Sequence, residues 1–218
     1  MTEPDSEIAN AIRYALLRRV SSGIRHRLLG ELQAIESLAD LAGRQLRLDT
    51  DSDQMLGGLS RIMAHARNAS ASCRSMAEWL RPEPGSTIPL GQGIAQCLEV
   101  AGDDWPLRGI EATTRLGDEE VLVDRTALRE LFTAILVTLI DMHPGALDIR
   151  VQSVTEGEYI NVEIHAVAGD RRSSITSSGH ERRFTWADVQ VLASAHGVPC
   201  ICHAHGATLR LRPPTERV

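Results

Sequence analysis

The sequence contains no lysine, and all 23 of its basic residues are arginine. This absence excludes catalysis by a lysine amine. Aromatic residues make up only 3% of the chain. The four cysteines, Cys73, Cys97, Cys200 and Cys202, are scattered, so no disulfide framework is predicted.

The chain also lacks an excess of basic charge, since 29 acidic residues outnumber 23 basic ones and the formal net charge is -6. A general nucleic-acid binder would be basic, so we expect no nucleic-acid partner. Long apolar runs are missing as well: the longest, residues 131–142, carries Asp141 and is too short to span a membrane. The first residues are acidic and polar, unlike a signal peptide. We therefore expect no membrane association and a cytoplasmic location.

Apolar residues follow one another at spacings of three or four from the N-terminal region onward. This spacing is typical of one apolar stripe on an amphipathic helix, which we predict from about Ser6 to about Leu48. The stripe consists of Ile8, Ile12, Leu16, Val20, Ile24, Leu28, Leu32, Ile35, Ala39 and Ala42.

A second helix is predicted after a turn at residues 49–53, which are rich in helix-capping residue types. Its matching stripe consists of Met55/Leu56, Leu59, Ile62/Met63, Ala66, Ala69, Cys73, Met76/Ala77 and Leu80. The two helices should form an antiparallel hairpin. A homodimeric four-helix bundle would bury both sides of such a hairpin.

Residues 81–86 contain two prolines and form a predicted linker, which divides the chain into a hairpin domain, 1–81, and a second domain, 87–218. Strands are predicted near 88–90, 110–115, 121–123, 147–154, 159–167, 198–203 and 208–211, with helices near 125–142 and 185–196 and another after the first strand. The predicted fold class is α+β, a helical hairpin followed by an α/β sandwich.

His26 faces away from the apolar stripe of the first helix. It lies two residues from both Ile24 and Leu28, which places it about 200° around the helix from either. We therefore expect the imidazole to be open to solvent.

The helical neighbours of His26 at three and four residues are Ser22, Gly23, Leu29 and Gly30. Three of them are too small to cover an imidazole, so a docking protein could reach the ring. Glycine inside a helix costs about 1 kcal/mol relative to alanine, and access to His26 is a reason to retain two of them.

Arg25 and Arg27 flank His26, and their charge would attract phosphate oxygens. An alternative is that both are ordinary surface charges of the helix. A lone exposed histidine is also commonly just solvated, so the surrounding pattern has to carry the interpretation.

The segment from His26 to Leu38 reads His-Arg-Leu-Leu-Gly-Glu-Leu-Gln-Ala-Ile-Glu-Ser-Leu. It resembles the phosphoacceptor box of the His-Arg-x-Lys-Asn branch of sensor histidine kinases. Leu29 and Gly30 stand where that box has lysine and asparagine. The resemblance implies that His26 accepts a phosphoryl group and that the hairpin dimerises.

Residues 88–214 resemble the ATP-binding domain of histidine kinases, most strongly in segments 123–131 and 196–213. The residues that would hold nucleotide are nevertheless missing. Ala134 and Thr138 occupy positions of the metal-binding asparagine, and Ala166 or Val167 occupies that of the adenine-binding aspartate.

The glycine-rich lid of that family is also missing, because residues 171–179 contain one glycine. We therefore expect this chain to bind no nucleotide and no metal. Arg171, Arg172, Arg182 and Arg183 could bind phosphate by another geometry, or form a solvated or protein-binding loop.

Cys200, Cys202, His203 and His205, with His196 nearby, could suggest a metal site. On a strand, however, the two cysteines point to one face and His203 and His205 to the other, so we favour packed cysteines. The sequence shows no partner pattern for the remaining histidines, His65, His143, His165 and His180.

The combined patterns predict a histidine phosphotransferase of a two-component phosphorelay. It would pass phosphate between receiver-domain aspartates through His26 without ATP, with Mg²⁺ supplied by the receiver. The expected partners are response regulator receiver domains, with a hybrid histidine kinase as a further candidate partner. The alternatives are a non-catalytic dimeric adaptor or inhibitor of a kinase or response regulator and, less favoured, a divergent active kinase.

Overall fold

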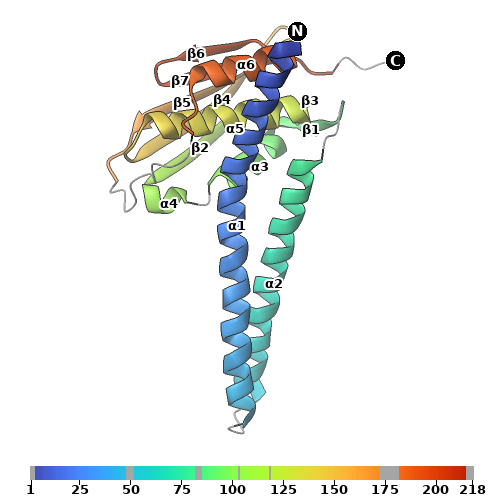
Figure 1. The fold of residues 1–218 in the computed structure, drawn as a ribbon, viewed down its shortest axis with the longest axis vertical. Helices are drawn as coiled ribbons and strands as arrows, with labels where there is room; N and C mark the ends of the chain where they lie inside the picture. The colour runs from blue at the N-terminus through green and yellow to red at the C-terminus, as the bar shows by residue number, and fades with distance from the viewer. Residues whose placement is uncertain are drawn as a thin grey trace. The chain divides into compact units, whose positions relative to one another are not determined.

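A computed structural model describes residues 3–47, 52–81, 85–102, 104–117, 119–171 and 182–214. Two long helices come first, α1 (Glu3–Arg47) and α2 (Ser52–Leu80), and an α/β segment follows (Figure 1). Both predicted helices are confirmed. The predicted turn lies partly outside the described residues, which resume at position 52.

The chain folds into two compact units, one of residues Met1–Val20 with Glu83–Val218 and the other of residues Ser21–Pro82. The sequence pattern predicted that residues 1–81 belong together in the hairpin domain. In the structure, the first part of α1 instead packs with the α/β segment, and the second unit holds the rest of α1 together with α2.

A mixed five-stranded sheet forms the centre of the α/β unit. Its order is β2 (Ile110–Leu116), β4 (Leu147–Glu156), β5 (Tyr159–Ala168), β7 (Gly206–Leu211) and β6 (Cys200–His203). β2 and β4 are parallel, and the other neighbours are antiparallel. A separate two-stranded ladder joins β1 (Thr87–Pro89) to β3 (Leu122–Asp124). All seven predicted strands are confirmed.

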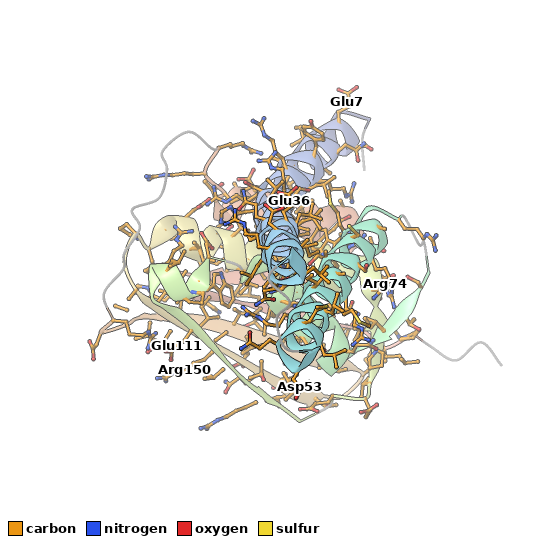
Figure 2. All side chains as sticks on the ribbon, turned by 90° about the horizontal axis from the view of Figure 1, so that it is seen from below. Glu7, Glu36, Asp53, Arg74, Glu111 and Arg150 are labelled. Atoms are coloured by element: carbon orange, nitrogen blue, oxygen red, sulfur yellow. The ribbon has the colours of Figure 1, made fainter. Side chains whose placement is uncertain are left out.

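The described residues of this segment form the helices α3 (Leu90–Ala101), α4 (Trp105–Arg108), α5 (Arg125–Met142) and α6 (Trp186–His196). α5 is buried on every side from residue 131 to residue 140, with α3 and α6 packed against it. Burial alternates along β4, so one face of the sheet is covered and the other is not. Glu111 and Arg150, labelled in Figure 2, are exposed residues of β2 and β4.

The first part of α1 contributes to the core of the α/β unit. Ile12 and Leu16 are fully buried in the same apolar cluster as the residues of α5. Between them in the sequence, Arg13 Nε donates to a carboxylate of α5, Glu130 Oε2, at 2.7 Å. Further along, Arg19 donates to Asp141 Oδ1 at 2.9 Å. Apolar burial and two ion pairs therefore hold this segment on α5.

In the hairpin unit, α2 turns one seam inward at alternating spacings of three and four residues, as in coiled coils. The partly or fully buried positions are Met55, Gly58, Ile62, His65, Ala69, Ser72, Met76 and Trp79. On α1 the corresponding positions include Ile24, Leu28, Glu31, Ile35, Leu38, Ala42 and Gln45.

This seam corrects the predicted stripes in detail. Leu32, Ala39 and Cys73 are exposed, whereas Leu38 and Ser72 are buried. The sequence prediction followed apolar residues alone, but the seam accepts polar side chains where they can pair. The α+β class, with a helical hairpin and an α/β sandwich, is confirmed, and the dimeric bundle stays a prediction.

Candidate functional site

His26 lies within the long helix α1 and is exposed, as is its neighbour Arg25. No described residue forms a hydrogen bond or ion pair with the His26 ring. Arg27 is partly buried, so Arg25 is the more accessible of the two flanking cations. The imidazole of His26 is therefore free to meet another protein.

The helical neighbours of His26 leave space around the ring. Ser22 and Gly23 are partly buried, while Leu29 is 52% exposed and Gly30 is exposed. A methyl group added at Gly30 would meet no atom within 4 Å. The predicted open surface beside the histidine is present in the hairpin unit.

A second histidine of the hairpin has a carboxylate partner. His65 Nδ1, on α2, lies 2.6 Å from Glu31 Oε2, on α1. Asn68 Nδ2 approaches the other carboxylate oxygen, Glu31 Oε1, at 3.5 Å. The sequence pattern did not predict this pair, because Glu31 and His65 are 34 residues apart. The pair could have been predicted only from the fact that both residues occupy inward-facing positions of their helices.

The positions that would carry a metal-binding asparagine are inside the protein. Ala134 and Thr138 on α5 are both 0% exposed. They lie on the stripe of α5 between Glu130 and Asp141, at helical spacings of three and four. Because Glu130 and Asp141 bind arginines of α1, the first part of α1 runs along this stripe. A ligand could reach it only if α1 moved.

Glu130 also accepts a hydrogen bond from α6, where His196 Nε2 lies 2.7 Å from Oε2. Burial alone would raise the pKa of Glu130. The hydrogen bonds from His196 and Arg13 outweigh that effect, so its pKa lies below the ordinary value. This carboxylate joins α1, α5 and α6 within the α/β unit.

The described part of the lid segment pairs with its own unit. Arg171 donates to the carbonyl oxygen of Gly109 at 3.1 Å and also bonds to Asp148. Arg182 bonds to Asp188, the first-turn carboxylate of α6. The predicted phosphate-binding role of Arg172 lies outside the described residues, which omit 172–181, as does any contact of His180. Arg183 is exposed.

At the predicted adenine positions on β5, Ala166 is buried and Val167 is exposed. Neither side chain can accept a hydrogen bond from an amino group. Position 166 faces the core, where only a small apolar side chain packs without cost.

Cys200 and Cys202 share one face of β6, with their sulfur atoms 3.9 Å apart, as the strand geometry predicted. Both pack against the apolar core. Burial and the neighbouring Cys202 raise the pKa of Cys200 to about 12. No group of three side chains within the described ranges could hold a metal ion.

The remaining histidines are distributed over the α/β unit. His143 Nδ1 lies 2.8 Å from the Leu139 carbonyl oxygen, and its ring is 5.8 Å from that of His205. His165 Nε2 lies 3.8 Å from a Glu163 carboxylate oxygen. None of these contacts brings the ring together with a nucleophile or a second carboxylate in the part of the chain described.

No protein-family model matches the sequence, and no curated protein matches it. Solved structures similar to this chain include Acinetobacter baumannii histidine kinase AdeS, with 12% identity, coverage of 85% of this chain and 98% of that chain, and a TM-score of 0.47. A bacterial phosphotransferase has 17% identity, covers 90% of this chain and 95% of that chain, and has a TM-score of 0.44.

A histidine kinase from Burkholderia phymatum is similar at 14% identity, with 98% of each chain covered and a TM-score of 0.43. Across the described residues, no helix has the length and apolar character needed to cross a bilayer.

Proposed function

We propose that this chain is a histidine phosphotransferase of a two-component phosphorelay. It passes phosphate between receiver-domain aspartates through His26 and uses no ATP. The observation that carries the proposal is the exposed His26, set among small residues on the face of α1 that turns away from the hairpin seam.

The chemistry needs a neutral ring nitrogen and an acyl phosphate. An imidazole nitrogen of His26 attacks the phosphorus of a phosphoaspartate, forms an N–P bond, and releases the aspartate carboxylate. The receiver's acidic pocket supplies the Mg²⁺, so this chain needs no metal of its own. Arg25 can steady the phosphoryl oxygens with charge-assisted hydrogen bonds, and Arg27, Ser22, Gly23, Leu29 and Gly30 form the surrounding contact surface.

The side chains of α5 at the positions of the metal-binding asparagine support a function of this chain that does not use ATP. Magnesium nucleotides need oxygen ligands near the phosphates, and Ala134 and Thr138 offer none at the surface. We propose that the α/β unit serves as a docking surface and binds no nucleotide. Calorimetry with an ATP analogue and Mg²⁺ tests this point, and micromolar binding would revive a divergent kinase.

We propose that the hairpin pairs with a second copy in a four-helix bundle in the cytoplasm. Apolar side chains remain exposed on it after its own seam is filled. They are Leu29, Leu32, Leu41 and Leu46 of α1 and Leu56, Leu59 and Met63 of α2. Leu56, Leu59 and Met63 continue the alternation of three and four and form a second stripe beside the seam.

The direct test uses receiver domains that carry labelled phosphate on their aspartate. The wild-type chain should take up the label, and His26→Gln should lose most of it. His203→Gln is the matched control, because His203 is an exposed histidine of the α/β unit and its removal should change nothing.

A non-catalytic adaptor or inhibitor is the second candidate, favoured by the exposed leucine at position 29 beside His26. Such a surface can bind a receiver or kinase without chemistry. Binding of a receiver with no transfer of label to the chain would select this candidate.

A further inference from the structure

In the Glu31–His65 pair, the carboxylate of Glu31 determines which ring nitrogen of His65 carries the hydrogen. His65 Nδ1 and Glu31 Oε2 are 2.6 Å apart, and the side chains are 32% and 19% exposed. A carboxylate can only accept hydrogen bonds, so the hydrogen lies on Nδ1. In the neutral ring the lone pair then belongs to Nε2, the nitrogen that faces away from Glu31.

Nε2 of His65 is available for reaction. Within the described residues no group bonds to this nitrogen, and the nitrogen is not buried. The nitrogen therefore reaches solvent. His26 lacks any such carboxylate among the described residues, so of these two histidines only His65 has an oriented ring.

The Glu31–His65 pair and His26 lie on different faces of α1, because Glu31 is in the seam and His26 is turned away from it. Around α1, Arg27 is about 40° from Glu31, Gly30 about 100° and His26 about 140°, all in one direction. Along the axis His26 and Glu31 are about 7.5 Å apart. The exposed apolar Leu32 lies about 100° from Glu31 in the opposite direction. A receiver would therefore approach the Glu31–His65 pair from a different direction than it approaches His26.

We propose that His65 is a second phosphate-accepting residue of the hairpin, activated by Glu31. The inference rests on the proposed relay function and extends it to a new site. Nε2 attacks the phosphorus of an acyl phosphate, an N–P bond forms, and the P–O bond to the departing carboxylate breaks. The Nδ1 hydrogen stays between His65 and Glu31 throughout.

The role of Glu31 follows from the charge that develops in this step. As Nε2 gives its lone pair to phosphorus, the ring becomes positive, and a carboxylate at 2.6 Å stabilises that charge. The position is otherwise one for an apolar side chain, since His65 occupies the inner seam of α2. A half-buried polar pair in the seam is weak evidence for a role in stability, so we assign the pair a chemical role.

The test begins with potassium phosphoramidate, a small donor that phosphorylates histidine directly. Phosphorus NMR and peptide fragmentation identify the labelled residue in the full-length chain. We expect fast labelling of His65, slowed about tenfold or more in Glu31→Gln, in line with other residues that orient a histidine. Glu36→Gln, an exposed carboxylate on α1, is the matched control and should label like the wild type.

The second arm uses phosphorylated receivers with the wild type, His26→Gln, His65→Gln and the double variant, each checked for wild-type helicity by circular dichroism. We expect the residual label of His26→Gln to lie on His65 and to vanish in the double variant. Label that maps to His26 alone would overturn the inference and leave the proposed function intact. Labelling of His65 by phosphoramidate at the rate of exposed His203, and equally fast in Glu31→Gln, would also overturn it. Activated labelling of His65 with no transfer from any receiver would support the site and contradict the relay.

Discussion

Arg13 of α1 donates to Glu130 of α5 across 2.7 Å, although the two residues are 117 positions apart. The same carboxylate oxygen lies 2.7 Å from His196 Nε2 of α6. This contact, with the burial of Leu16, assigns the first part of α1 to the α/β unit. Residues near the N-terminus therefore stabilise a domain that otherwise begins beyond position 82.

Leu16→Ala tests this assignment. Leu16 is 1% exposed and Tyr14, two residues away, is 69% exposed. Leu16→Ala should destabilise the protein by about 2–5 kcal/mol, because it removes buried methyl groups and leaves a cavity. Tyr14→Ala should change the free energy of unfolding by less than about 0.5 kcal/mol. Urea unfolding followed by tryptophan fluorescence measures both, and equal effects would contradict the packing described here.

The lowered pKa of Glu130 predicts a dependence of stability on pH. A carboxyl whose pKa is lower in the folded than in the unfolded state stabilises the protein above its unfolded pKa, about 4.3. That contribution is lost as pH falls through the folded pKa. Wild type should therefore exceed Glu130→Gln in Tm at pH 7, and the difference should shrink below about pH 4. A difference that stays constant down to about pH 2 would contradict the shift.

Gly30→Ala separates helix stability from access to His26. The new methyl group meets nothing within 4 Å and removes a helix glycine, so the hairpin should gain about 1 kcal/mol. Transfer of phosphate to His26 should nevertheless slow, because the methyl group stands beside the docking surface. Gly57→Ala is the control, since Gly57 is exposed with equal space but lies on α2. It should stabilise similarly and leave the transfer rate unchanged.

The exposed apolar stripe of α2 predicts the oligomeric state. Light scattering should give about twice the chain mass of 23.8 kDa for the wild type. Leu59→Glu with Met63→Glu places two charges on that stripe and should halve the measured mass. Val154→Glu changes an equally exposed residue of β4 and should leave the dimer intact. A wild-type protein that scatters as a monomer would refute the bundle.

Local signals in the sequence predicted the elements well. α5 runs from Arg125 to Met142 as expected, because Asp124 accepts a hydrogen bond from the Ala127 amide at 2.7 Å and begins the helix. The apolar spacing that fixed α1 and α2 is likewise a property of neighbouring residues. The strands follow from short apolar runs between turns.

Relationships between distant residues could not be predicted in this way. The seam of the hairpin includes Glu31 and His65, which a search for apolar periodicity passes over. Their pairing depends on the register of α1 against α2, and no local pattern specifies that register. The contact of Arg13 with Glu130 depends on tertiary packing for the same reason. Candidate chemistry at His26 was accessible from sequence because it rests on one helix alone.

A reconstituted relay tests the central claim most directly. One receiver domain is phosphorylated with label, freed of donor, and mixed with a second receiver in the presence of Mg²⁺ and the absence of ATP. We predict that label reaches the second receiver only when this chain is added, and that His26→Gln removes most of the transfer. Transfer that is equally fast without the chain or with His26→Gln, or that requires ATP, would contradict the account.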